Sequence, residues 1–336
     1  MNNNCCADCC GAPEKTIPAV SASLSLKDIF GAWKARWGIG RMDYKIEPDL
    51  YAIGMPGDNS PVLVSANYKL TFDTLRKNLS GLDCWLLILD TKGINVWCAA
   101  GKGTFGTEEL ANRVKATGLS EVVTHRKLIL PQLGAPGVSA HEVAKLTGFS
   151  VTYGPVRASD IKAFISSGCK ATQEMRTVNF PMWDRLVLTP VEFVQTIKIS
   201  LMLFGVLFLL NLFAARPFGM GDFLAYSAAV LAGAVATPLF LPFIPGKAFA
   251  FKGWLLGAIS TVCVAWAYGW FASPLLLAGY MLALPAHSAF LAMNFTGAST
   301  YTSFSGVIKE MKFAVPIIVF SSVAGIILIL TATFTG

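Results

Sequence analysis

The sequence predicts a protein of two parts, in which an α/β domain with a mostly parallel sheet is followed by a membrane domain of five helices. Charge is distributed unevenly, because residues 1–193 contain 21 of the 27 Lys and Arg residues and 18 of the 20 Asp and Glu residues. Short apolar runs alternate with amphipathic segments in this first part, as strands and helices of an α/β fold do. Five long apolar runs fill the second part.

The composition agrees with this division. Of the 336 residues, 54% are hydrophobic and only 14% are charged, which is too apolar for an ordinary soluble protein. The net charge of +7 is shared by both parts. No run rich in Lys and Arg is interleaved with aromatic residues, so we expect no nucleic-acid partner.

Residues 1–24 are polar, small and rich in cysteine, and they predict a disordered tail. Four thiols fall within six residues there, at Cys5, Cys6, Cys9 and Cys10. Adjacent thiols bind soft ions such as Hg(II), so these four are candidate Hg(II) ligands. A tail without a metal is the simpler interpretation. Disulfides are not expected, because the soluble part is predicted to be cytoplasmic.

The soluble domain is predicted over residues 25–193. Residues 25–38 should form a helix with Trp33 and Trp37 packed in the core. Strands are predicted at 62–65, 84–90, 122–124, 128–130 and 151–153, and helices at 71–79, 107–116, 139–147 and 158–166. Ser139 and Glu142 predict a capping box on the third of these helices, and Ser159 a cap on the last. Buried strands separated by helices predict a parallel sheet, with ligands at the carboxyl ends of the strands.

The predicted strand 84–90 is followed by the segment Asn95-Val96-Trp97-Cys98-Ala99-Ala100-Gly101-Lys102. A cysteine where a strand passes into a helix can be stabilised as a thiolate, which is a strong ligand for soft metals. No His, Asp, Glu or second Cys lies between Ile94 and Glu108 to complete a zinc or iron–sulfur site. A lone thiolate suits a metal held by a macrocycle, either haem or a corrinoid.

The alternative is that Cys98 is a buried structural cysteine. The small residues that follow it favour a ligand, because they let a flat macrocycle approach the backbone. Gly101-Lys102-Gly103-Thr104 does not match a phosphate-binding loop. Lys102 is therefore either solvated or paired with a phosphate or amide of a cofactor tail. The loops 131–137 and 153–157 also follow strands, so each is a wall of the same pocket or a simple turn.

Five runs are long and apolar enough to span a membrane. They are residues 194–214, 223–244, 254–271, 275–295 and 313–334. Lys247 and Lys252 follow the second run, and Lys309 and Lys312 precede the fifth. The positive-inside rule then places the soluble domain in the cytoplasm and the C-terminus outside, in a multi-pass protein of the inner membrane. Residues 1–20 lack the apolar segment of a signal peptide.

The segment NVWCAAGK at 95–102 resembles the cap-helix motif of the mercury-methylating corrinoid protein family. The resemblance extends through residues 65–83, 130–143, 153–161 and 295–311. It implies a Rossmann-like corrinoid-binding domain, related to that of the corrinoid iron–sulfur protein, which lacks the cysteine ligand. It also implies a cobalamin bound base-off, with Cys98 as the lower axial ligand of cobalt. The implied cofactor-binding residues are Ser65, Thr71, Asn95, Val96, Trp97, Cys98, Ala99, Ala100, Gly101, Lys102, Gly137, Tyr153, Gly154, Pro155, Val156, Arg157 and Ala158.

The activity that the resemblance implies is transfer of a methyl group from cobalamin to Hg(II), which yields methylmercury. A methyltetrahydrofolate-type donor would replace the methyl group, and a ferredoxin-like 4Fe-4S partner would reduce the cobalt again. A thiolate ligand favours delivery of the methyl group as a carbanion or radical equivalent, which Hg(II) requires. Two alternatives stay open: a methyl carrier of one-carbon or acetyl-CoA metabolism for which mercury is incidental, and a membrane receptor or transporter with a soluble regulatory domain.

Overall fold

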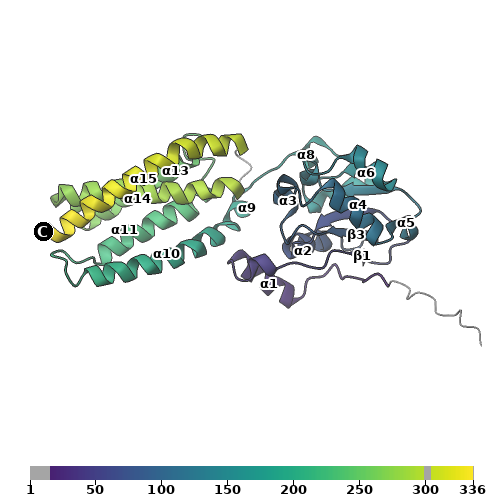
Figure 1. Cartoon of the computed structure of the whole chain (residues 1–336), viewed down its shortest axis with the longest axis horizontal. Coiled ribbons are helices and arrows are strands. Elements are labelled where there is room, and N and C mark those ends of the chain that lie inside the picture. Colours follow the sequence, from purple (N-terminus) through teal and green to yellow (C-terminus); the bar gives the residue numbers. More distant parts are fainter. Residues whose placement is uncertain (1–15, 299–303, 336) are drawn as a thin grey trace, which may run out of the picture. The chain divides into compact units, whose positions relative to one another are not determined.

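The computed structural model describes residues 16–298 and 304–335, which form two compact units (Figure 1). The soluble unit comprises Met1–Ala35 and Gly40–Val178, and the membrane unit comprises Arg36–Ile39 and Asn179–Gly336. The predicted tail thiols Cys5, Cys6, Cys9 and Cys10 lie outside the described residues.

The soluble unit is built on a five-stranded sheet. Its strands are β1 (Leu50–Ile53), β2 (Val62–Ala66), β3 (Cys84–Leu89), β4 (Lys127–Leu130) and β5 (Ser150–Tyr153). They lie in the order β1-β3-β2-β4-β5, and every neighbouring pair is parallel except β1 with β3. The prediction of a mostly parallel sheet is confirmed. The antiparallel edge strand β1 was not predicted, because its four residues are too few to show a period.

Helices follow the strands as the pattern predicted. They are α1 (Leu26–Arg36), α2 (Lys69–Asn78), α3 (Val96–Lys102), α4 (Thr107–Ala116), α5 (Leu119–Val122), α6 (Ala140–Thr147), α7 (Ile161–Ser166) and α8 (Gln173–Arg176). Short 3-10 turns lie at Arg41–Asp43 (η1), Gln132–Gly134 (η2) and Ala158–Asp160 (η3).

Three local predictions were wrong. The predicted strand 122–124 is absent, because Gly118 adopts a left-handed conformation and opens the short helix α5 in its place. Ser159 does not cap a helix; it bonds the side chain of Asp160, which precedes α7. Ser139 does cap α6, but its backbone N–H bonds the Thr107 hydroxyl at 2.9 Å, so no reciprocal bond from Glu142 forms.

Both faces of the sheet are buried. Alternate residues of β3 point to opposite sides, with Leu87 and Leu89 in one apolar cluster and Leu86 and Ile88 in the other. Helices α3, α4 and α6 contribute to the first cluster, and α2 and α7 contribute to the second. A strand that is buried on both faces has apolar residues at every position, which explains the continuous apolar sequence of β3.

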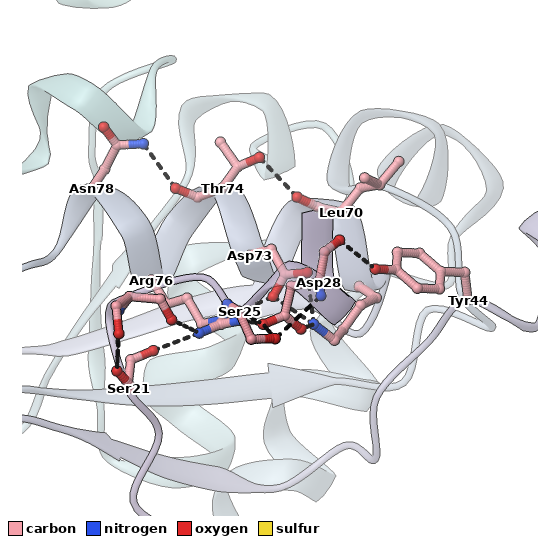
Figure 2. Close-up of polar contacts among 11 residues, drawn as sticks. Ser21, Ser25, Asp28, Tyr44, Leu70, Asp73, Thr74, Arg76 and Asn78 are labelled. Carbon is pink, nitrogen blue, oxygen red and sulfur yellow. Dashed lines mark hydrogen bonds and ion pairs between the residues drawn. The ribbon is translucent and has the colours of Figure 1, made fainter. Parts of the chain in front are cut away.

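A cluster of charged side chains attaches α1 to α2 (Figure 2). Asp28 of α1 accepts from Lys69 at 2.7 Å and from Arg76 at 2.8 Å, and Asp73 shares both cations. The hydrogen bond from Lys69 holds the pKa of the Asp28 carboxyl well below its usual range. Arg76 also donates to the carbonyl of Ser21, so the segment before α1 is held as well.

The expected core packing of Trp33 is wrong, because this side chain is 56% exposed. Its neighbour Ala35 is fully buried. The helix therefore turns a different face to the domain than Trp33 suggested, and Trp37, just after the helix, is half-buried.

The second unit contains five helices that are long and apolar enough to cross a membrane, counted among the described residues. They are Met182–Leu210, Met220–Leu239, Phe249–Ala267, Pro274–Asn294 and Ser305–Thr335. The five spans were predicted, but the first and last begin earlier than 194 and 313, because a helix continues through its charged flanking residues. The sidedness of the membrane remains a prediction.

The helices of this unit are α9 (Met182–Leu186), α10 (Thr189–Leu210), α11 (Met220–Leu231), α12 (Thr237–Leu239), α13 (Phe249–Ala267), α14 (Pro274–Asn294) and α15 (Phe304–Thr335). A π-helical turn at Ala232–Ala236 joins α11 to α12. Glycines set the close packing of α14 with its neighbours: a Cβ on Gly253 would lie 2.4 Å from Ala292, and one on Gly325 2.6 Å from the backbone of Ala283. Small residues are the usual means of close helix packing in membranes.

The charged cluster leads to a prediction for α1. Replacement Asp28→Ala leaves Lys69 and Arg76 with one carboxylate to share, so we expect α1 to detach more readily, at a cost of about 1–3 kcal/mol. Hydrogen exchange of the amides of α1 measures this cost. Asp43→Ala is the matched control, because Asp43 is exposed. Equal exchange in the two variants would contradict the role given to Asp28.

Candidate cofactor site

A cavity of about 390 Å³ lies at the carboxyl edge of the sheet. Residues from the ends of β2 and β4, the loop after β5, the first turns of α2 and the start of α3 enclose it. Its lining is mostly apolar and consists of Leu63, Val64, Ser65, Tyr68, Leu70, Thr71, Thr74, Leu75, Asn95, Val96, Trp97, Ile129, Leu130, Pro131, Leu133, Gly154, Pro155, Val156, Ala158 and Ile161. This edge is where open parallel sheets bind their ligands.

The hydroxyl groups of the lining are suited to a polar ligand group. Ser65 is the last but one residue of β2 and is 3% exposed, and Thr71 lies in the first turns of α2. Neither hydroxyl has a hydrogen-bond partner within the residues that the structure describes. Both are therefore available to a molecule in the cavity.

A tight turn connects β3 to α3, and the side chain of Asn67 organises it. The Asn67 amide oxygen accepts from the backbone N–H of Thr91 at 3.1 Å and of Gly93 at 3.0 Å, while its NH₂ group donates to Asp90 at 3.2 Å. Asn67 is 1% exposed and lies directly after β2. Its amide thus links the ends of two neighbouring strands to the turn that starts α3.

Lys92 closes this turn in a left-handed conformation, with φ of 59°. Its side chain and backbone N–H both bond Asp90. Partial burial acts to raise the pKa of Asp90, but the bonds from Lys92 and Asn67 outweigh it and hold the pKa below its ordinary value. The carboxylate that supports the turn is therefore ionised at neutral pH.

Helix α3 begins with a side-chain cap. Asn95 is in an extended conformation, and its Oδ1 accepts from the backbone N–H of Cys98 at 2.9 Å. Gly103 ends the helix with φ of 79°, a left-handed conformation that glycine adopts without strain. Because α3 has only seven residues, these two caps are a large part of what fixes it.

The two sides of α3 differ. Val96, Ala99 and Ala100 are buried in the core, whereas Cys98 is half-buried. Gly101, three residues after Cys98, has no atom within 4 Å of where a Cβ would stand. The thiol thus shares its helix face with an open surface that no side chain covers, as approach of a flat ligand requires.

The loop 131–138 supports the opposite side of α3. A Cβ on Gly137 would lie 2.2 Å from the carbonyl oxygen of Phe105 and 3.0 Å from Cα of Ala100. Tyr153 of β5 fixes the same loop, because its hydroxyl donates to the carbonyl of Val138 at 2.6 Å. In this structure both residues set the position of α3, and neither lines the cavity.

The structure thus divides the residues implied by the resemblance into two groups. Those that line the cavity are Ser65, Thr71, Asn95, Val96, Trp97, Gly154, Pro155, Val156 and Ala158. Those outside its lining are Cys98, Ala99, Ala100, Gly101, Lys102, Gly137, Tyr153 and Arg157. Lys102 and Arg157 are exposed.

Sequence reasoning missed Asn67 and the cavity residues Thr74 and Ile161, whereas Leu133 belongs to the loop 131–137 that was considered as a pocket wall. The signal for Asn67 was a polar residue directly after a mostly apolar strand. Among the described residues no three His, Cys, Asp or Glu side chains gather to hold a metal ion.

Comparisons with known proteins agree with this geometry. Residues 40–165 match the family described as the CO dehydrogenase/acetyl-CoA synthase delta subunit. The acetyl-CoA decarbonylase/synthase complex subunit gamma of Methanopyrus kandleri is 35% identical over 127 residues, which cover 37% of this chain and 27% of the relative. The corrinoid/iron-sulfur protein large subunit of Moorella thermoacetica is 34% identical over 122 residues, or 36% and 27% of the two chains.

The chain therefore spans about a quarter of the length of these curated relatives. The match makes the soluble unit similar to subunits of acetyl-CoA synthase and decarbonylase complexes and to a corrinoid/iron-sulfur protein. It covers the whole sheet and α3, and the membrane unit lies outside it.

The turn before α3 leads to a second prediction. Replacement Asn67→Ala leaves the buried N–H of Thr91 and the partly buried N–H of Gly93 without an acceptor, and we expect a loss of about 1–3 kcal/mol for the unmade bonds. Faster hydrogen exchange of residues 91–102 would report a loosened α3. Asn59→Ala is the control, because Asn59 is exposed. Unchanged exchange in Asn67→Ala would show that other contacts fix the turn.

Proposed function

We propose that the chain is a corrinoid-dependent methyltransferase that forms methylmercury from Hg(II), with Cys98 as the lower axial ligand of cobalt. One observation supports this most strongly. A single half-buried thiol lies on a capped helix beside a cavity, in a domain similar to corrinoid proteins. The resemblance of residues 95–102 to the mercury-methylating family supplies the particular reaction.

The residues present fit a corrinoid. The open surface beside Cys98 suits the flat macrocycle, because Gly101 adds no side chain there. The cavity is too small for a whole macrocycle but suits a nucleotide-like tail, such as a base-off cobalamin would present. The free hydroxyls of Ser65 and Thr71 would bond polar groups of this tail, while Leu63 and Leu130 would enclose its apolar part.

When bound, a corrinoid supplies a cobalt that accepts a methyl group from one molecule and passes it to another. The chain's own contribution is the ligand and its orientation. Asn95 holds the N-terminal turn of α3 and thereby the backbone of Cys98. A thiolate is a strong electron donor, and this donation favours transfer of the methyl group to an electrophile such as Hg(II).

The proposal includes three partners. A methyltetrahydrofolate-type donor provides the methyl group, and a ferredoxin-like 4Fe-4S protein provides electrons. The inner membrane holds the protein through its five candidate spans, with the soluble unit in the cytoplasm.

A second candidate function is supported by the comparisons. The relatives are named as subunits of acetyl-CoA decarbonylase/synthase complexes, which favours a methyl carrier of one-carbon metabolism. In that case mercury would be an incidental acceptor. The same residues would bind the cofactor, so only the acceptor distinguishes the two functions.

The ligand role of Cys98 predicts a spectrum. Protein purified without oxygen should show cobalamin absorbance typical of thiolate ligation, and Cys98→Ala should lose this feature. Cys263→Ala is the matched control, because Cys263 is exposed on α13, far along the chain from the site. A protein without corrinoid would contradict both candidate functions. An unchanged spectrum in Cys98→Ala would contradict the ligand role alone.

The acceptor is tested by methylmercury formation with Hg(II), a reduced ferredoxin partner and a methyl donor. We expect product from the wild-type protein and none from Cys98→Ala. A variant with Cys5, Cys6, Cys9 and Cys10 changed to Ser should lose only part of the activity. Complete loss in that variant would make the tail essential, and no mercury-dependent product from the wild type would favour the methyl carrier.

A further inference from the structure

The outer face of α1 is apolar and exposed. Leu26, Ile29, Phe30 and Trp33 follow one another at helical spacing, and each has more than half of its surface exposed. Exposed apolar patches of this kind mark interaction surfaces more often than chance. The stripe is unrelated to the cavity and to Cys98.

The opposite face of α1 is fixed to the soluble unit. Asp28 bonds Lys69 and Arg76 of α2 (Figure 2). Ala35 is fully buried, and Gly31 lies so close to Tyr44 that a Cβ would stand 2.5 Å from its hydroxyl oxygen. Residues 28, 31 and 35 lie on one side of a helix, and 26, 29, 30 and 33 on the other. The attachment therefore holds the apolar stripe outward and prevents the helix from turning it inward.

The charges around the stripe are positive. Lys27 and Lys34 fall between the two faces of the helix, both are exposed, and neither forms an ion pair with any described residue. The one acidic residue of α1, Asp28, is held by two cations on the inner face. Asp43 is the nearest exposed carboxylate in the sequence, and it lies outside the helix.

We propose that α1 is an interfacial helix that places its apolar stripe in the membrane surface, with Lys27 and Lys34 on anionic lipid headgroups. An apolar face flanked by lysines is the pattern of helices that lie in a membrane surface. A lipid surface is also the partner that the candidate spans of the same chain would bring with them. Covalent attachment raises the effective concentration of this surface, so one short helix is enough.

The consequence goes beyond the proposed reaction. Since α1 is fixed to α2, and α2 lines the cavity, an interfacial α1 would hold the soluble unit at the membrane in one orientation. The cavity and α3 would then face a constant direction relative to the lipid surface.

The test uses the full chain in lipid nanodiscs, with the photo-crosslinking residue p-benzoylphenylalanine in place of Phe30. Illumination in discs of phosphatidylcholine with phosphatidylglycerol should give lipid adducts on the peptide that contains residue 30. The matched control carries the same residue in place of Met55, which is 90% exposed on the loop after β1, and should give few adducts. Discs of phosphatidylcholine alone, or the double change Lys27→Gln and Lys34→Gln, should lower the yield at position 30 several-fold.

Equal lipid yields at positions 30 and 55 would overturn the proposal. So would crosslinks from position 30 to another protein segment, whether in the chain's own membrane unit or in a second copy. If the adduct yield at position 30 changed neither without phosphatidylglycerol nor on replacement of Lys27 and Lys34, the assignment to anionic lipid would be overturned. None of these outcomes depends on corrinoid binding, so they are independent of the proposed function.

Discussion

The side-chain amide of Asn67 is the contact on which the candidate site depends most. It lies at the end of β2, accepts from two backbone N–H groups of the turn after β3, and donates to Asp90. Two strand ends and one helix start are thereby fixed by one buried side chain. A helix of seven residues cannot hold its own position, so the direction in which α3 presents Cys98 follows from this turn.

Two glycines also determine the surroundings of α3. Because Gly137 has no side chain, its loop approaches the backbone of Ala100 and Phe105 closely. Gly101 leaves the surface beside the thiol open. The same residue type thus serves two purposes on the two sides of α3, close packing on one and free access on the other. Chemically the result is one thiolate ligand beside a cavity of hydroxyl and apolar groups.

Much of this arrangement could be predicted from the sequence. The apolar run of β3 and the Ser139 cap of α6 have local causes, so these two elements were found. The place of the cavity followed from the rule that ligands meet parallel strands at their carboxyl ends. The five membrane helices followed from length and apolarity alone.

What the sequence could not show depends on contacts between distant segments. Strand β1 forms because it pairs with the free edge of β3, and no local sequence pattern predicts it. Asn67 acquires its role only when the end of β3 lies beside it. Gly137 and Tyr153 support α3 through contacts with residues far away in the sequence, and their contact with a cofactor stays a prediction. Trp33 looked like a core residue, but the ion pairs of Asp28 fix the helix with this side chain outward.

The central claim is that Cys98 provides a sulfur ligand to a cobalt held at α3. X-ray absorption at the cobalt edge of the cobalamin-loaded full chain tests this most directly, because it identifies the atoms bound to the metal. The account predicts one sulfur neighbour in the wild-type protein and in Cys263→Ala, and none in Cys98→Ala. A cobalt surrounded only by nitrogen and oxygen in the wild type, or a sulfur that persists without Cys98, would contradict it.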